Sequence, residues 1–170
     1  MAIQTMKPID ILKDLKLKQI AQEFPNLPKF AYPKMKYTDT TANGLTKAVI
    51  EFLTMSGHQA ERISTTGRPI DNTKTITNVL GQRKVIGSME WIPGTGRKGS
   101  ADISSTIGVE IAGHKVGLSV KFEVKIGADR QSGHQKEYEQ EVNSTGGKYY
   151  IIRSFDDFYE KYINLINSYK

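Results

Sequence analysis

One segment limits the possible folds of this chain more than any other. Residues 118–126, LSVKFEVKI, alternate apolar and polar side chains without a break. A period of two is typical of a β-strand that buries one face and turns the other away from the core. The polar face of this predicted strand carries Glu123 and Lys125 as near neighbours.

The sequence just upstream predicts a partner for this strand. Asp102, Ser104 and Thr106 also alternate with more apolar positions, and residues 108–113 contain two glycines that favour a turn. A hairpin or meander over residues 101–126 would therefore bring Asp102 close to Glu123.

Helices and further strands are expected around this β region. Apolar residues recur at helical spacing over residues 8–23, 41–55 and 155–166, and residues 132–143 also favour a helix. Residues 58–64 are predicted to form a short strand, and the β-type run over residues 148–153 predicts another. Residues 65–78 are predicted to form a polar loop, and residues 83–92, RKVIGSMEWI, a further strand. Together these elements predict an α/β fold, a mixed β-sheet flanked by helices.

The first part of the chain differs from the remainder. Residues 24–34 contain three prolines, which predict an extended linker and a boundary near residue 38. Residues 1–36 carry seven lysines against three acidic residues, a local surplus of four positive charges. We therefore divide the sequence into a basic helical arm with its linker, residues 1–38, and a core domain, residues 39–170.

Composition excludes several classes of protein. The absence of cysteine rules out disulfides, a thiolate nucleophile and cysteine-ligated zinc or iron–sulfur centres. No apolar run is long enough to span a bilayer, and the first residues do not have the pattern of a signal peptide, so a cytoplasmic location and no membrane partner are expected. The net charge of +6 favours a polyanionic partner such as DNA.

Asp102, Glu123 and Lys125 suggest a hydrolytic site. Two carboxylates on adjacent strands can hold a hard divalent cation, and a neighbouring ammonium can stabilise charge on a phosphate. The competing interpretation is a solvated strand face with a surface ion pair, which spacing alone makes equally plausible. Asp14 and Lys16 have the same spacing, but they belong to a helical pattern in which positions i and i+2 point in different directions.

The order of these elements resembles the PD-(D/E)XK nuclease core, and in particular the VRR-NUC group of virus-type replication-repair nucleases. Five segments carry the resemblance: ANGLTKAVIEFL (42–53), GHQAERI (57–63), GSADI (99–103), FEVKIGADRQSGHQKEYEQ (122–140) and GGKYYIIRSFDDF (146–158). The family usually has proline before the first aspartate, whereas this chain has Ala101. The first 40 residues lie outside the resemblance.

The resemblance implies a role for each matched residue. Asp102 and Glu123 correspond to metal ligands, with the Val124 backbone carbonyl as a third ligand and Mg²⁺ or Mn²⁺ as the cofactor. Lys125 corresponds to the residue that positions water or stabilises charge. Glu51 corresponds to an acidic residue near the metal, and Gln135 to a group that orients the lysine or contacts phosphate.

Several further residues are candidates for binding nucleic acid. Residues 94–99 match the dinucleotide pattern G-x-G-x-x-G, but a β pattern follows where that motif needs a helix, so we interpret this segment as a basic loop that contacts phosphate. Arg62 and Arg130 could bind phosphate or belong to ordinary surface ion pairs. The candidates are Arg62, Arg97, Lys98, Arg130, Ser132 and His134.

The resemblance implies hydrolysis of DNA phosphodiester bonds, selective for nicked, flapped or branched structures, in phage or prophage replication, repair or recombination. A phage-encoded enzyme would act in the host cytoplasm. A dimeric Holliday-junction resolvase is the alternative enzyme, since two sites facing two strands require a two-fold pair. The alternative from another class is a non-catalytic DNA-binding accessory protein on the same fold.

Overall fold

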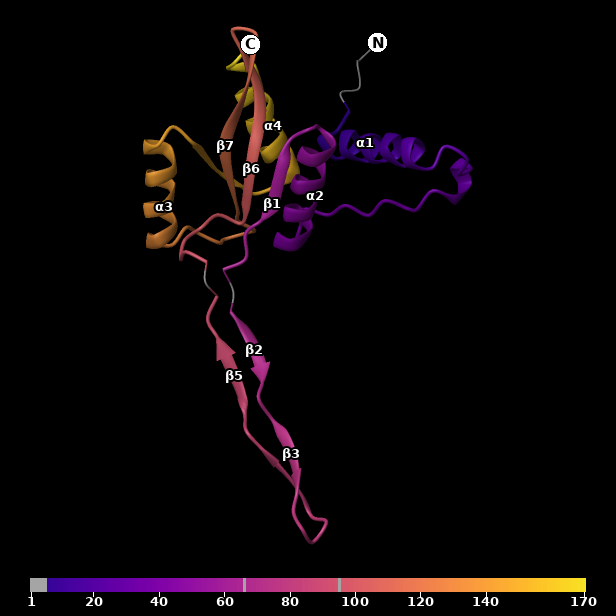
Figure 1. Ribbon diagram of the computed structural model, residues 1–170. Helices are drawn as coiled ribbons and strands as arrows, with labels where there is room; N and C mark the ends of the chain where they lie inside the picture. Colours follow the sequence, from indigo (N-terminus) through magenta and orange to yellow (C-terminus); the bar gives the residue numbers. More distant parts are fainter. Residues whose placement is uncertain (1–5, 66, 95) are drawn as a thin grey trace.

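The computed structural model describes residues 6–65, 67–94 and 96–170, and its body is a four-stranded mixed sheet flanked by helices (Figure 1). The strands run in the order β1 (Gln59–Arg62), β6 (Ile103–Ile111), β7 (His114–Val124) and β8 (Lys148–Ile152). The first three are antiparallel neighbours, and β8 lies parallel to β7. The predicted α/β class with a mixed sheet is confirmed at this level.

The alternating segment forms β7, as its period of two predicted. Val120, Phe122 and Val124 are buried in the core, and Phe122 lies opposite Ile103 of β6. The parallel step from β7 to β8 is made by the crossover helix α3 (Gly133–Ser144). The strand predicted from the alternating pattern, with its apolar side chains facing the core, is therefore the strand that the structure shows before Lys125.

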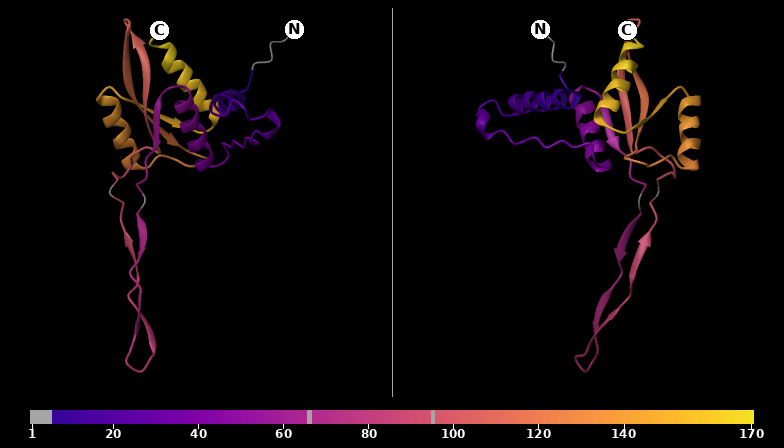
Figure 2. Two further views of the ribbon diagram at one scale, coloured as in Figure 1. Left: turned by 45° about the vertical axis from the view of Figure 1, so that its right-hand side comes forward. Right: turned by 180° about the vertical axis from the view of Figure 1, so that it is seen from behind.

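Two helices enclose the aromatic part of the main core. In this part, α2 (Ala42–Met55) and α4 (Phe155–Asn167) meet where the Phe52 ring makes edge-on contacts with Phe155 and Phe158. Both helices begin with a side-chain cap, Thr41 and Ser154 respectively. α3 lies on the other side of the sheet, as the views in Figure 2 show. None of the helices in the described ranges is long and apolar enough to cross a membrane.

The N-terminal helix α1 (Pro8–Glu23) begins at the predicted Pro8 and packs against the body. Leu12 is fully buried in the same core as α2 and α4. The proline-rich segment that follows contains only a short 3-10 helix, η1 (Lys29–Ala31), among extended residues. Helix α1 thus contributes to the main core, while the boundary near residue 38 stays a prediction.

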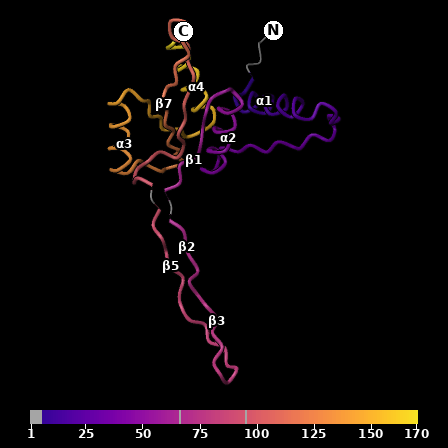
Figure 3. The backbone as a smooth tube through the Cα atoms, in the orientation of Figure 1, coloured from indigo at the N-terminus to yellow at the C-terminus, as the bar shows by residue number. Residues whose placement is uncertain are grey.

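The prediction for residues 65–78 is wrong, because most of this segment is β-structure. β2 (Arg68–Asp71) pairs with β5 (Met89–Ile92), and β3 (Lys74–Thr77) pairs with β4 (Arg83–Ile86). Residues 83–92, predicted as one strand, form two. Residues 67–94 together make a two-stranded ribbon, here called the β-arm, that projects away from the body (Figures 1 and 3).

Candidate active site

The candidate site begins where β6 starts and β7 ends. Asp102 directly precedes β6, and its Oδ2 accepts a hydrogen bond from the Val124 backbone N–H at 2.9 Å. Its backbone carbonyl accepts from the Ile63 N–H at 2.8 Å, which ties the end of β1 to the same place. The predicted approach of Asp102 to the Glu123 strand is confirmed.

Glu123 and Lys125 form a buried ion pair rather than a solvated one. Their residue surfaces are only 2% and 5% exposed, and Lys125 Nζ lies 3.1 Å from Glu123 Oε1. The alternative interpretation as a solvated strand face is therefore wrong. Because removing two charges from water costs several kcal/mol per ion, such a pair needs further polar partners.

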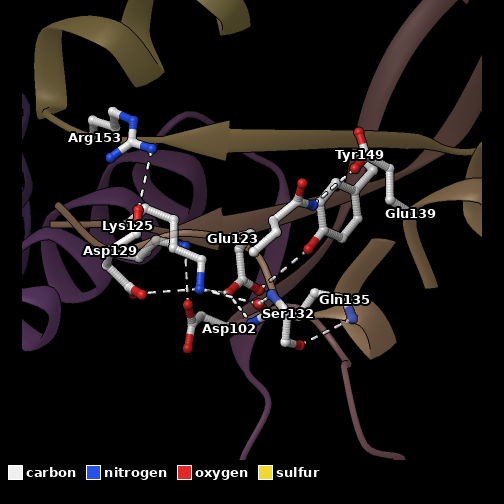
Figure 4. A network of polar contacts seen from close by, with 11 residues as sticks. Asp102, Glu123, Lys125, Asp129, Ser132, Gln135, Glu139, Tyr149 and Arg153 are labelled. Atoms are coloured by element: carbon white, nitrogen blue, oxygen red, sulfur yellow. Dashed lines mark hydrogen bonds and ion pairs between the residues drawn. The ribbon is translucent and has the colours of Figure 1, made fainter. Parts of the chain in front are cut away.

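The Lys125 ammonium contacts Glu123 and two further polar groups. Its ammonium lies 3.1 Å from Glu123 Oε1, donates to Gln135 Oε1 at 3.1 Å and lies 3.3 Å from Asp129 Oδ2 (Figure 4). An ammonium can donate three hydrogen bonds, and here it meets one amide oxygen and two carboxylates. Of the two carboxylates, Asp129 is the exposed one, with 57% of its side chain accessible.

Gln135 joins the ion pair to the start of α3. Ser132 is the N-cap of this helix: its Oγ accepts from the Gln135 N–H, and Gln135 Oε1 accepts in return from the Ser132 N–H at 2.9 Å. The Gln135 amide nitrogen donates to Glu123 Oε1. This capping box fixes the glutamine at the site. Ser132, predicted to bind nucleic acid, has its hydroxyl committed to the cap.

Sequence reasoning missed three residues that complete this network. Tyr149 lies on the predicted strand over residues 148–153 and is buried, and its hydroxyl donates to Glu123 Oε2 at 3.3 Å. Asp129 contacts Lys125, and Arg153 donates to the backbone carbonyls of Gly127 and Asp129, which holds their turn. Periodicity could identify Tyr149 as buried but could not identify what its hydroxyl meets.

Burial and neighbouring groups shift the pKa values of both Glu123 and Lys125. Desolvation raises the pKa of Glu123; the hydrogen bond from Lys125 offsets part of this, and the nearby Asp102 charge adds to the rise. For Lys125, desolvation lowers the pKa, but the hydrogen bonds and charges of Glu123 and Asp129 outweigh it, so the pKa is raised. The lysine therefore stays charged at neutral pH.

The residues at this site have the right chemistry for a hard cation. Asp102 and Glu123 supply carboxylate oxygens, the charge of Asp102 contributes to the raised pKa of Glu123, and the Val124 N–H is held by Asp102. Hard oxygen donors are what Mg²⁺ and Mn²⁺ prefer. Over the described residues, however, no three His, Asp or Glu side chains gather closely enough to form a metal cluster.

The structure does not bring Glu51 to this pair. Its Oε2 accepts a hydrogen bond from the Tyr37 hydroxyl at 2.6 Å, and its Oε1 lies 3.7 Å from Lys47 Nζ. Both oxygens thus have partners in the segment before α2 and on α2 itself. The sequence placed Glu51 correctly on its helix, but the direction of the side chain depends on Tyr37, which no pattern revealed.

The predicted nucleic-acid contacts fall into two groups. Arg97 lies 2.5 Å from Glu141 and stacks 5.5 Å above the Tyr138 ring, and His134 lies 3.6 Å from Glu137, so both meet side chains of α3. Arg62, Lys98 and Arg130 are exposed and form no ion pair within the described ranges. The second group retains free positive charge near the site.

Gly99 allows the loop before Asp102 to approach α3. Its φ is +83°, and a Cβ added there would lie 2.3 Å from the His134 carbonyl oxygen. Only glycine fits both the conformation and the space. The match of residues 94–99 to a nucleotide-binding pattern therefore has a local structural reason at its last glycine.

Comparison with protein-family models, with curated proteins and with solved structures found no match for this chain.

Proposed function

We propose that this chain is a metal-dependent nuclease of the PD-(D/E)XK type, which hydrolyses DNA phosphodiester bonds. One observation carries the proposal: a buried glutamate–lysine pair ends β7, next to Asp102 at the start of β6. The pair is hydrogen-bonded by Gln135 from the helix that follows. The same residues, in the same order of elements, carry the sequence resemblance to this class.

Asp102, Glu123 and the Val124 carbonyl would hold Mg²⁺ or Mn²⁺. When bound, such a cation neutralises charge on the scissile phosphate and acidifies a water molecule. Without a cation, two carboxylates would repel a phosphodiester, so their presence at a DNA-binding site needs a positive partner. A carboxylate pair beside an ammonium supports catalysis more than simple binding.

Lys125 has the properties of a phosphate-stabilising group. Its raised pKa keeps it charged, and burial strengthens its electrostatic effect. Its ammonium already contacts three acceptor groups, so a phosphate oxygen would replace one of them. Asp129 is the partner to be replaced, because it is exposed and the longest of the three contacts. Gln135 is then a positioning residue that keeps Lys125 beside Glu123.

The finer features of the proposal come from the resemblance and the charge of the chain. We propose nicked, flapped or branched DNA as the substrate, phage replication or repair as the setting and the host cytoplasm as the location. A dimeric junction resolvase is the narrower form of this proposal. The exposed Arg62, Lys98 and Arg130 are the proposed phosphate contacts around the site.

One observation favours a second candidate, a non-catalytic DNA-binding protein. Both carboxylate oxygens of Glu123 receive hydrogen bonds from within the chain, from Gln135 and from Tyr149. The buried pair is therefore satisfied by protein groups alone, as a purely structural ion pair would be. This candidate predicts DNA binding that no metal converts into cleavage.

The test is a cleavage assay on labelled single-stranded, duplex, flap and four-way-junction DNA with Mg²⁺, Mn²⁺ or EDTA. Wild type is compared with Lys125→Ala and Glu123→Gln. We expect metal-dependent cleavage that falls about 100-fold or more in each variant. Circular dichroism checks that each variant is folded.

Glu110 and Lys115 provide matched controls. They lie opposite each other at the far end of the β6–β7 hairpin and are exposed. Glu110→Gln and Lys115→Ala should leave cleavage within about twofold of wild type, since exposed pairs contribute little. Binding without cleavage under every metal would overturn the nuclease proposal and favour the second candidate.

A further inference from the structure

The β-arm has no cover from the rest of the protein. Within it, β2 contacts β5 and β3 contacts β4. Among the described residues, no helix and no strand of the four-stranded sheet packs extensively against them. All the views show it extending away from the body (Figures 1, 2 and 3). An isolated two-stranded ribbon is at best marginally stable in water, so we expect a binding partner to stabilise the β-arm.

The exposed apolar side chains point to the nature of that partner. Met89 and Trp91 are 61% and 60% exposed, and Val85 is 64% exposed. Large apolar side chains gathered on one exposed element usually mark a protein interface. Those exposed on the β-arm are Ile76, Val79, Leu80, Val85, Ile86, Met89, Trp91 and Ile92.

Only one edge of the ribbon is suited to further strand pairing. The edge formed by β2 and β3 contains Pro69, which has no backbone N–H and is typical of strand edges that stay unpaired. The edge formed by β4 and β5 contains no proline and carries most of the exposed apolar residues. Its backbone groups can pair with another strand.

The order of side chains along this edge is self-complementary about Gly87. Lys84 and Glu90 lie at equal sequence distances before and after Gly87, as do Val85 and Met89. Arg83 and Trp91 are related in the same way, and an arginine can stack on an indole ring. Two copies of the edge running in opposite directions would therefore place Lys84 opposite Glu90 and Val85 opposite Met89, with Ile86 opposite Ser88.

Gly87 also marks the structural middle of the β-arm. It lies between β4 and β5, has a φ of +92°, and a Cβ there would lie 2.3 Å from the Asn72 carbonyl oxygen. The two halves of the ribbon differ in charge: the half nearer the body carries Arg68, Asp71 and Glu90, whereas the half beyond Gly87 has three cations and no acid. These cations are Lys74, Arg83 and Lys84.

We propose that the β-arm is a dimerisation element that pairs with the β-arm of a second copy of this chain. The two-fold axis passes near Gly87, and β4 of one copy lies antiparallel to β5 of the other. Lys84 of each copy then faces the partner's Glu90, twice in the dimer. This is the isologous contact expected of a two-fold pair, and it does not depend on the proposed nuclease activity.

Charge exchange tests the proposed register. Lys84→Glu places two like-charge pairs across the dimer, as does Glu90→Lys, and each should weaken dimerisation about tenfold or more. The double variant Lys84→Glu with Glu90→Lys restores opposite charges and should return to near the wild-type dissociation constant. Lys74→Glu, on the other edge of the ribbon, is the control and should change little. Sedimentation equilibrium over a range of concentrations measures all four variants.

Cysteine cross-linking provides a second readout, since the natural chain has no cysteine. Lys84→Cys mixed with Glu90→Cys should give a disulfide-linked heterodimer under mild oxidation, more readily than either variant alone. A protein that stays monomeric at all attainable concentrations would overturn the proposal, as would a dimer unaffected by both charge changes. If the protein is instead monomeric, and Lys84→Glu and Lys74→Glu lower its affinity for DNA by the same factor, the β-arm contacts nucleic acid and the dimer proposal is overturned.

Discussion

Removing the ammonium of Lys125 should leave Glu123 as an uncompensated buried charge. Lys125→Met keeps the length and apolar stem of the side chain but deletes the positive group 3.1 Å from Glu123 Oε1. Breaking a buried ion pair from one side costs about 3–5 kcal/mol. Since domains of this kind have stabilities of about 5–15 kcal/mol, the free energy of unfolding should fall by a large fraction at pH 8.

The loss should depend on pH in a definite direction. Burial already raises the pKa of Glu123, and removing Lys125, which lowers it, raises it further. The folded state then holds a proton that the unfolded chain has released, so stability is present below the unfolded glutamate pKa of about 4.3 and decreases as pH rises towards the folded pKa. Lys125→Met should therefore be more stable at pH 5 than at pH 8.

A second substitution should recover the stability. Glu123→Gln in the Lys125→Met background removes the buried charge and should restore most of the lost free energy. Urea unfolding followed by circular dichroism is the assay, because the single tryptophan, Trp91, lies on the exposed β-arm and reports poorly on the core. Lys115→Met is the control for an exposed lysine on the same strand.

If the Lys125→Met protein unfolds within about 0.5 kcal/mol of wild type at pH 8, the range of ordinary surface substitutions, the unpaired Glu123 carboxylate does not destabilise the fold. An equal loss of stability in the single and double variants would also show that the cost does not come from this carboxylate.

Three further predictions concern groups around the pair. Gly99→Ala should cost about 2 kcal/mol or more in urea unfolding and reduce cleavage, because its Cβ would meet the His134 carbonyl at 2.3 Å with φ at +83°. Ser132→Ala should cost about 1 kcal/mol through the lost N-cap, measured in the same way. Tyr149→Phe removes a hydrogen bond that lowers the pKa of Glu123, so that pKa should rise and the acid limb of the pH–rate profile move to higher pH.

Each of these three predictions has its own control or its own result that would contradict it. Gly127→Ala also has a positive φ, of +58°, but meets nothing within 4 Å, so it should cost less than Gly99→Ala. A fully stable Ser132→Ala protein would mean that the cap contributes nothing. An unchanged pH–rate profile in Tyr149→Phe would show that ionisation of Glu123 does not limit the reaction.

The sequence predicted the part of the fold in which one face is buried. The period of two over residues 118–126 required Glu123 and Lys125 to share a face, and their ion pair confirms this. It could not show that this face is covered, because the cover comes from Gln135 and Tyr149, which are distant in sequence. Spacing therefore left a solvated ion pair and a hydrolytic site equally plausible.

The β-arm was missed for the opposite reason. Almost all residues of its strands are exposed on both faces, so burial imposes no alternating pattern on them. Turn-forming and polar residues between Gly67 and Asn78 then favoured a loop. Pairing between β2 and β5 joins residues about 20 positions apart, a separation that local propensity does not reveal.

Glu51 and Arg97 show a further limit. The resemblance placed Glu51 near the metal ligands, whereas its carboxylate meets Tyr37 and Lys47. Arg97 was expected to contact phosphate but pairs with Glu141. In both cases the residue type was compatible with function, and the direction of the side chain was set by a tertiary partner that no local pattern specifies.

Mn²⁺ binding to the free protein shows whether Asp102 and Glu123 form a cation site beside Lys125. The bound ion can be measured by the loss of the electron paramagnetic resonance signal of free Mn²⁺, with Glu110→Gln as the control for an exposed carboxylate. We predict one binding event in wild type and in the control, and its loss in Asp102→Asn. Equal uptake of Mn²⁺ by all three proteins, or by none, would contradict the account.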